Sequence, residues 1–216
     1  GLGDVYKRQY DDSSDSTKVG VLGAFVGDNI EGLIQVTRRD THERKLHNQV
    51  EIAPNSMSGE SNSVLAKLKF LLNESFDLTF TADIQEWKND WNLETETGFS
   101  FFPTPTQTSS ALGTDESSRH RYSVELGFNN SNMFFDEGRI TAFAQNTEQD
   151  QITDNSKLIF EMGMRARPTP YSEYQNFQFN QEIFGITSEF YKEIVNQSGV
   201  RHQIVYGIEY ESIDVE

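Results

Sequence analysis

Apolar and polar residues alternate along most of this chain of 216 residues. In a β-strand, successive side chains point to opposite faces, so a period of two gives the strand one apolar and one polar face. No stretch has a convincing period of 3.6 residues, and we therefore predict an all-β protein. The clearest strand has Phe76, Leu78, Phe80, Ala82 and Ile84 on one face and Asp77, Thr79, Thr81, Asp83 and Gln85 on the other.

The alternation predicts about eight strands. Several exceed about 12 residues, whereas a strand in a globular domain has about 5–6 and a tilted strand that crosses a bilayer needs about 9–11. Strand length therefore favours a barrel that crosses a membrane. Leu33, Phe143 and Val205 fall out of phase with their neighbours. The predicted strands are Thr17–Val26, Ile30–Arg44, Ser61–Asn73, Ser75–Asn89, Arg119–Asn130, Gly138–Gln149, Gln181–Val195 and Arg201–Val215.

The connections between these strands alternate in length. The short, polar ones are Gly27–Asn29, Asn73–Glu74, Ser131–Glu137 and Asn196–Val200. The long ones are Lys45–Glu60, Asp90–Ser118 and Asp150–Asn180, of which the last has candidate strand pieces at Lys157–Arg165 and Tyr171–Phe179. Short turns on one rim and long loops on the other are typical of outer-membrane barrels. We predict an antiparallel up-and-down transmembrane β-barrel, present as an incomplete set of strands.

Composition excludes several classes of protein. The chain has no Cys, which rules out a disulfide scaffold, a zinc ribbon, an iron–sulfur cluster and a thiol nucleophile. With 18 basic and 34 acidic residues its net charge is −16, which argues against nucleic acid as a partner. The longest apolar run, Val21–Val26, is far shorter than the roughly 18 residues of a spanning helix.

The first nine residues, Gly1–Gln9, differ in origin from the rest in our interpretation. Asp4–Gln9 reads DVYKRQ, and its back-translation GAT GTG TAT AAG AGA CAG matches the transposon end used in sequencing libraries. We attribute these residues to a translated adaptor and leave them out of the fold prediction. We expect residues 10–216 to be an internal fragment of a longer protein.

Three local patterns, taken in order, carry a resemblance to a known family. They are Ser63-Val-Leu-Ala-Lys-Leu68 at a strand start, Arg119-His-Arg-Tyr-Ser-Val124 at a strand start after a long loop, and His202-Gln-Ile-Val-Tyr-Gly-Ile-Glu209 after a short turn. The segment Thr17–Glu216 resembles the barrel region of TonB-dependent outer-membrane receptors. The subgroup it resembles is that of the haem, haemoglobin, transferrin and lactoferrin receptors.

The resemblance implies a bacterial outer-membrane barrel of about 22 strands, plugged by an N-terminal domain. It implies an active transporter rather than an enzyme, energised by the TonB complex through the plug, with haem, a haem protein or a siderophore as ligand. The plug and its TonB-contacting peptide are not in this chain. No catalytic residue, metal ligand or cofactor is expected, and the resemblance carries over no ligand-binding residue.

The two strand faces then have assigned roles. A wide lumen keeps polar inward side chains hydrated, so we expect the apolar face to contact lipid and the charged face to meet water or the plug. The charged residues are Lys67, Lys69, Asp77, Asp83, Glu125, Glu189 and Glu209. Aromatic residues near strand ends are candidates for the interfacial girdle of such barrels. These are Trp87, Trp91, Tyr191 and Tyr210.

Motif searches find no phosphate-binding loop, dinucleotide fingerprint, zinc-protease helix or nucleophile elbow. His42 and His47, five residues apart, are candidate ligands for haem iron or a metal, with solvated loop histidines as the favoured reading. His120 could form a catalytic triad with Ser117 and Asp115, but the sequence has no nucleophile elbow around Ser117. We therefore predict that His120 lies at a rim of the barrel. Asp11–Asp15 resembles the start of a calcium loop but lacks the Gly and the later Glu of that motif.

Two alternatives remain open. A passive porin-like channel would have the same barrel wall without the plug. A soluble lipocalin-like barrel would turn the apolar face inward around a small ligand, which would bring Phe80, Tyr122 and Tyr206 into a dry centre. For a partial barrel we expect either a curved open sheet or a forced small closure with outward apolar side chains, namely Phe76, Phe80, Tyr206 and Ile208.

Overall fold

The computed structural model describes residues 2–45, 55–160, 167–195 and 199–216. These residues form strands, their connections and one short 3₁₀ turn, η1 (Glu94–Glu96). The strands are β1 (Leu2–Asp11), β2 (Ser16–Val26), β3 (Ile30–His42), β4 (Ser56–Asn73), β5 (Phe76–Asn92), β6 (Gly98–Ser100), β7 (Thr106–Asn129), β8 (Glu137–Ile159), β9 (Thr169–Val195) and β10 (Arg201–Val215).

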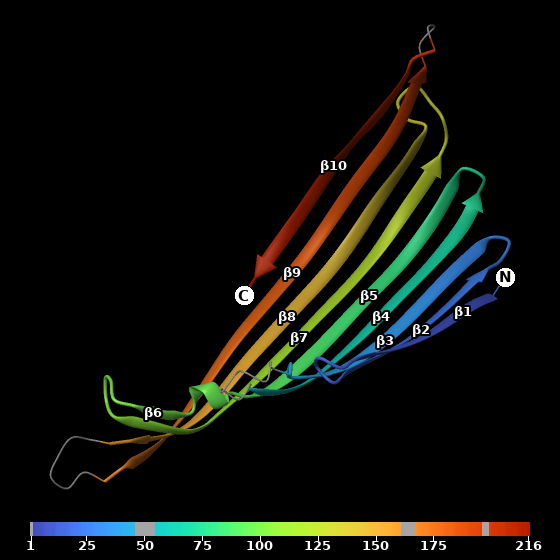
Figure 1. Cartoon of the computed structure of the whole chain (residues 1–216). Helices are drawn as coiled ribbons and strands as arrows, with labels where there is room; N and C mark the ends of the chain where they lie inside the picture. Colours follow the sequence, from blue (N-terminus) through green and yellow to red (C-terminus); the bar gives the residue numbers. More distant parts are fainter. Residues whose placement is uncertain (1, 46–54, 161–166, 196–198) are drawn as a thin grey trace.

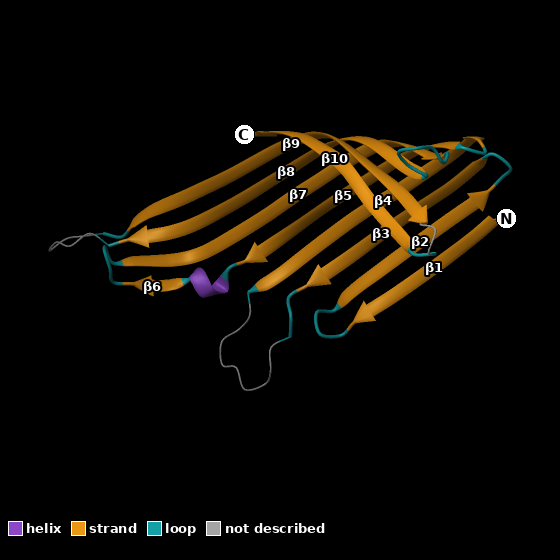
Figure 2. Cartoon of the chain, turned by 90° about the horizontal axis from the view of Figure 1, so that it is seen from above, coloured by secondary structure: helices purple, strands orange, loops and turns teal. Residues whose placement is uncertain are grey.

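All ten strands belong to one antiparallel sheet. Consecutive strands are neighbours, in the order β1-β2-β3-β4-β5-β7-β8-β9-β10, and β6 pairs with β7. The sheet is curved, with β1 and β10 at opposite edges (Figures 1 and 2). The sequence-based prediction of an all-β, up-and-down antiparallel architecture is confirmed, and the sheet is open rather than forced into a small closure.

The predicted count of eight strands is too low. One missing strand, β1, contains most of the residues that we attribute to an adaptor, and it pairs with β2 from Leu2 opposite Phe25 to Asp11 opposite Ser16. Backbone pairing requires no particular side-chain pattern, so a strand at this position does not test whether these residues come from an adaptor. That attribution stays a prediction. The other missing strand, β6, has three residues, too few to show any alternation.

The predicted strands lie in the right places, but several are too short. β7, β8 and β9 have 24, 23 and 27 residues. β7 starts at Thr106 rather than Arg119, β8 ends at Ile159 rather than Gln149, and β9 starts at Thr169 rather than Gln181. These extensions are mostly polar, and their few apolar residues, such as Leu112, Ile152 and Phe177, do not share one face. They therefore lack the regular alternation that marks a half-buried strand. Most of two predicted long loops is therefore sheet, as Figure 1 shows for β7, β8 and β9.

The extensions also change the setting of two patterns on which the resemblance rests. Ser63 and Arg119 lie inside β4 and β7, which begin at Ser56 and Thr106, rather than at strand starts. His202 does lie at the start of β10. Within the extension of β9, the expected strand piece Tyr171–Phe179 is confirmed. Of the piece expected at 157–165, residues 157–159 belong to β8, and 161–165 lie outside the described residues.

The connections differ between the two ends of the strands. At one end, which we call the turn rim, the connections are 27–29, 74–75, 130–136 and 196–200. At the other end, the loop rim, they are 12–15, 43–55, 93–105 and 160–168. Asparagine side chains stabilise two connections at the turn rim. Asn73 Oδ1 accepts bonds from the backbone N–H groups of Ser75 (2.8 Å) and Phe76 (3.0 Å), and Asn132 Oδ1 does the same for Phe134 and Phe135.

In a soluble protein the apolar face of a sheet is the buried one. Here the apolar face is the more exposed of the two. On the apolar face, Phe80 is 42% exposed, Tyr122 51% and Tyr206 43%. On the polar face, Thr79 is 3% exposed and Phe143 5%. The sheet therefore has no dry core that contains Phe80, Tyr122 and Tyr206.

Candidate functional site: a sheet with two unlike faces

The apolar face carries a continuous band of apolar side chains, because residues paired directly across antiparallel strands share a face. We call it the apolar band. Its height along β5, from Phe76 to Ile84, is about 27 Å, and a strand tilt of about 40° reduces this to roughly 21 Å. That is close to the apolar height of about 25 Å in outer-membrane barrels. Its rows are Val36-Val64-Ile84, Ile34-Ala66-Ala82-Tyr122-Ala144-Phe184, Gly32-Leu68-Phe80-Val124-Ala142-Ile186 and Ile30-Phe70-Leu78-Leu126-Ile140.

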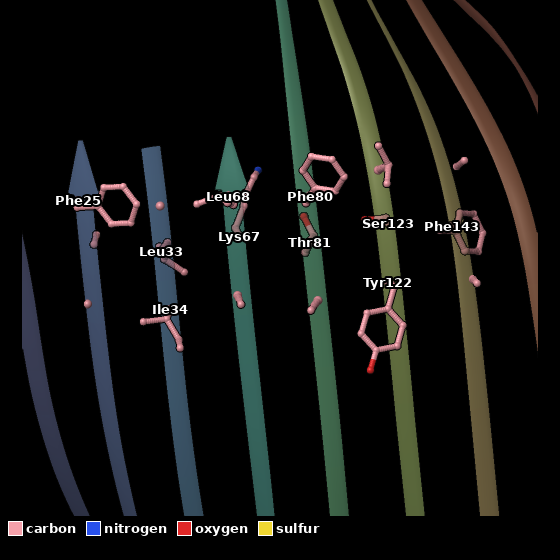
Figure 3. A pocket seen from close by; sticks show the side chains of 18 of the residues that line it. Phe25, Leu33, Ile34, Lys67, Leu68, Phe80, Thr81, Tyr122, Ser123 and Phe143 are labelled. Carbon is pink, nitrogen blue, oxygen red and sulfur yellow. The ribbon is translucent and has the colours of Figure 1, made fainter. Parts of the chain in front are cut away.

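The middle of the apolar band contains an open hollow of about 930 Å³. Alanines contribute much of its lining, and larger side chains such as Phe25, Phe80 and Tyr122 line it as well (Figure 3). The hollow spans β1 to β9 and follows the strand surface rather than entering the sheet. Small side chains set beside rings give the band a rough surface, suited to flexible hydrocarbon chains. The alanines are Ala24, Ala66, Ala82, Ala142 and Ala144.

Toward the loop rim, the apolar band gives way abruptly to charge. Glu86 lies two residues beyond Ile84 on the same face. Two residues further on, Lys88 lies opposite Glu60 on one flanking strand and opposite Glu116 on the other. Lys88 Nζ is 2.5 Å from Glu116 Oε1, and this hydrogen bond raises the pKa of Lys88. We call this region the charged belt, and it marks one limit of the apolar band. Its members are Arg38, Asp40, Glu60, Glu86, Lys88 and Glu116.

Toward the turn rim, the apolar band ends in an aromatic cluster on the same face. Its members are Phe128, Phe135, Phe190 and Tyr206, with neighbouring ring centroids 5.1–5.9 Å apart. The Tyr206 hydroxyl donates to the backbone carbonyl of Phe134 (3.0 Å). An apolar ring with a hydrogen-bonding tip suits a boundary between hydrocarbon and water.

Three of the four residues that we predicted for the aromatic girdle lie on the wrong face of the sheet. Trp87, Trp91 and Tyr191 lie on the polar face, because each is out of phase with the band residues of its strand. Tyr210 does share the apolar face, opposite Ile186. Strand parity applied to Phe128, Phe190 and Tyr206 would have found the aromatic cluster, whereas proximity to a strand end alone does not determine the face.

The polar face joins neighbouring strands through ion pairs. Lys69 pairs with Asp77 (3.5 Å), Arg119 with Asp83 (2.9 Å) and Arg139 with Glu189 (2.7 Å). The seven charged residues assigned to one face from sequence do share it. Their side chains are only partly buried, so this face is compatible with water and not with hydrocarbon.

Phe143, which breaks the alternation, lies on the polar face and yet is almost fully buried. Arg121 places its guanidinium carbon 4.0 Å from the centre of the ring, a cation–π contact. On the neighbouring strand, the ring lies over Gly185, where a Cβ would come within 2.4 Å of Phe143 Cζ. A charged neighbour and a missing side chain together shield this phenylalanine from water.

The structure does not assemble the candidate catalytic group. Ser117 and Asp115 lie on the polar face of β7, whereas His120 lies on the apolar face, so the three side chains diverge. His120 is well inside β7 rather than at a rim, at the border of the apolar band and the charged belt. Its Nε2 is 3.4 Å from Glu86 Oε1.

His42 is exposed and its Nδ1 lies 3.4 Å from the Asp15 carbonyl oxygen. Its proposed partner, His47, lies outside the described residues. In the described part of the chain, no group of three or more His, Asp or Glu side chains is arranged to hold a metal ion.

In the acidic turn between β1 and β2, carboxylates bond to other side chains of the same protein. Lys45 Nζ contacts Asp12 (3.0 Å) and Asp15 (3.3 Å), and the Tyr10 hydroxyl donates to Asp15 (2.5 Å). The bonds from Tyr10 and Lys45 lower the pKa of Asp15. Bonds from Ser13 do the same for Asp11. The carboxylates therefore have partners that a bound calcium ion would have to displace.

Comparison with known proteins assigns no family. No protein-family model matches the chain, and no curated protein matches it. Among the residues that the structure describes, no helix has the length and apolar character needed to cross a membrane.

Proposed function

We propose that this chain is part of the barrel wall of a bacterial outer-membrane receptor that imports an iron-bearing ligand with TonB-derived energy. The observation that supports this best is the position of the apolar band. It lies on the more exposed face, its height is close to the apolar height of outer-membrane barrels, and it ends in charge on one side and in an aromatic cluster on the other. A lipid bilayer has this sequence of environments.

The polar face would then line a hydrated lumen or face a plug domain. Its cross-strand ion pairs fix the side chains of neighbouring strands without a dry core. Transport in this proposal involves no bond chemistry. The ligand is captured at the loop rim, the TonB complex displaces the plug, and the ligand passes along the polar face. The proposal that the ligand is haem, a haem protein or a siderophore rests on the three local sequence patterns alone.

The structure gives the soluble lipocalin-like alternative no support. That barrel needs the apolar face turned inward around a closed cavity. Here the apolar face is open, and its hollow lies on the surface of an unclosed sheet.

The membrane part of the proposal is tested by depth-dependent fluorescence quenching. Both native tryptophans are replaced by Phe, and single tryptophans are introduced at Phe80, at Glu86 and at Thr81. In vesicles containing lipids brominated along their chains, we expect strong quenching at position 80 and weak quenching at 86. Position 81, next to Phe80 but on the polar face, is the matched control and should not be quenched. Equal quenching at 80 and 81 would contradict the proposal.

The receptor part is tested separately, in the bacterium that carries the gene. We expect the complete gene to encode a plug domain before the barrel. Its deletion should abolish growth when haem, a haem protein or a ferric siderophore is the only iron source, and loss of TonB should have the same effect. A complete gene without a plug, together with growth indifferent to TonB, would favour the porin-like channel.

A further inference from the structure

On the polar face, strands β5, β7, β8 and β9 carry a second aromatic group, which lies between the ion pair Arg119–Asp83 and, nearer the loop rim, the ion pair Lys157–Glu173. These strands lie side by side (Figure 1). Three rows of cross-strand partners make up what we call the aromatic–amide surface. They are Trp87-Ser117-Gln149-Phe179, Asn89-Asp115-Gln151-Phe177 and Trp91-Gly113-Thr153-Gln175.

Two of the four aromatic side chains of this surface are exposed to solvent at a place where lipid contact does not explain it, whereas Trp91 and Phe179 are half-buried. Trp87 is 38% exposed and Phe177 59%. They lie on the face opposite to the apolar band, and further toward the loop rim than the end of the band at Ile84. Rings that neither packing nor lipid covers are available to stack against a ligand.

Trp91 is held in position by a hydrogen bond. Its indole N–H donates to Asp115 Oδ2 at 3.0 Å, across to the neighbouring strand. Strands are about 4.8 Å apart, so Trp87 and Phe179, three strands away in the same row, are about 14 Å apart. Trp87 and Trp91, four residues apart, are separated by about 13 Å along the strand. The rings therefore border a patch long enough for several rings of a ligand.

The chemistry between the rings selects for a neutral ligand. Asp115 is the only ionisable residue in the three rows, and Trp91 already bonds to it. The rows contain no Lys or Arg to pair with a carboxylate or phosphate. Instead they offer amides at Asn89, Gln149 and Gln151, which donate and accept hydrogen bonds at once, whereas the amide of Gln175 already donates to Glu173 (2.8 Å). A ligand with many hydroxyl groups needs both hydrogen-bond donors and hydrogen-bond acceptors.

We propose that the aromatic–amide surface binds a neutral oligosaccharide. The C–H faces of sugar rings stack on Trp87, Phe177 and Phe179, since polarised C–H groups are attracted to the negative face of an aromatic ring. The amides bond to the sugar hydroxyls. This goes beyond import of an iron-bearing ligand and requires only that the polar face is open to water.

Intrinsic fluorescence is a direct probe, because both tryptophans of the chain lie in this surface. The whole chain is refolded in dodecyl dimethylamine oxide micelles, which have no sugar headgroup to compete. An array of neutral gluco-, xylo-, manno- and galacto-oligosaccharides, with carboxylated and sulfated counterparts, is screened first. The strongest neutral binder is then titrated with tryptophan emission and acrylamide quenching as readouts. We expect a blue shift and protection from acrylamide.

Matched variants decide whether binding occurs at this surface. Phe177→Leu and Gln149→Leu should each weaken binding roughly fivefold or more. Phe80→Leu and Tyr122→Leu, which alter rings on the apolar face, should leave it unchanged. Strand content by circular dichroism confirms that each variant is folded. Binding of anionic sugars alone, of no array member, or with equal strength in Phe177→Leu and wild type would overturn the proposal. None of these results would affect the lipid-quenching test.

Discussion

At the scale of single residues, phenylalanine rings repeatedly lie across a glycine on the next strand. Phe25 faces Gly32, Phe128 faces Gly138 and Phe143 faces Gly185. In each pair a Cβ on the glycine would come within 2.1–2.4 Å of the ring. Glycine weakens a strand by itself, but here its missing side chain is the space in which the neighbouring ring lies.

The clearest test of these pairs is Gly185→Val. We expect a loss of about 1–3 kcal/mol in the free energy of unfolding, because the ring of Phe143 must leave its position. Urea unfolding in micelles measures it. Gly23→Ala is the matched control, since the nearest side-chain atom to its Cβ, on Ile34, is 3.8 Å away. An equal loss in both variants would refute the packing account.

The turn between β7 and β8 depends on a single carboxylate. Asp136 accepts hydrogen bonds from Lys192 Nζ (2.8 Å), from Ser131 Oγ (2.5 Å) and from the backbone N–H of Glu193 (2.8 Å). The bond from Lys192 contributes most to holding the pKa of Asp136 well below its usual value, followed by those from Ser131 and Glu193.

A pH dependence follows for this turn. A carboxylate whose pKa is lowered by folding stabilises the fold above its unfolded pKa of about 3.9, and this stabilisation is lost as the pH falls through the lower native value. We expect amide exchange at Glu193, Phe134 and Phe135, corrected for the intrinsic pH effect, to stay slow at pH 4. Exchange should quicken only in stronger acid. Asp136→Asn should remove this transition; a midpoint near 4 would show that the bonds are absent in solution.

At the scale of elements, the strands are amphipathic only over the height of the apolar band. There each strand presents a regular apolar face, and beyond it β7, β8 and β9 continue with mostly polar residues and no regular apolar face. Backbone hydrogen bonding to the neighbouring strand maintains these extensions. They carry Glu116 of the charged belt on one face and, on the other, the part of the aromatic–amide surface that lies outside β5.

The cost of placing a charged side chain on the apolar face should depend on its position along the strand. Arginine at Ala82, in the middle of the band, is expected to cost about 2–4 kcal/mol of folding free energy in a bilayer, whereas Glu86→Arg, beyond its end, should cost about 0–1. Refolding into phosphatidylcholine vesicles across a urea series gives both values. The same cost at both positions would place the bilayer elsewhere on the sheet.

At the scale of the whole molecule, the sheet has two free edges. β1 and β10 each pair on one side only, and every residue of β10 is exposed. Unpaired edge strands are templates for pairing with another chain. The chain by itself therefore has a built-in route to self-association that a closed barrel lacks.

This predicts oligomers of the isolated chain. In micelles, light scattering after size exclusion should give protein masses at multiples of 24.7 kDa that rise with concentration. Ile208→Lys, a charge on the edge strand β10, should shift the distribution toward the monomer. Ser63→Lys, a charge on the inner strand β4, should not. A monomer at every concentration would show that the edges are closed in solution.

The sequence alone determined the fold class and the composition of each face. A period of two in Phe76–Gln85 needs no tertiary information, because strand geometry forces alternate side chains apart. It predicted the cores of eight strands, the two rims, and the shared face of Asp77, Asp83 and Glu125. It failed at most of the extensions of β7 and β8, where sparse apolar residues do not keep to one face, and in the extension of β9 it found only the piece Tyr171–Phe179.

Only the tertiary structure decided which residues are partners. Register places Phe143 over Gly185 and brings Phe128, Phe190 and Tyr206 together. Parity within one strand, by contrast, already puts Trp87 and Trp91 on the polar face, and our prediction of a girdle from strand ends overlooked it. The physical reason is that alternation fixes a side chain's face within its own strand, whereas its neighbours depend on how far each strand is displaced along the next.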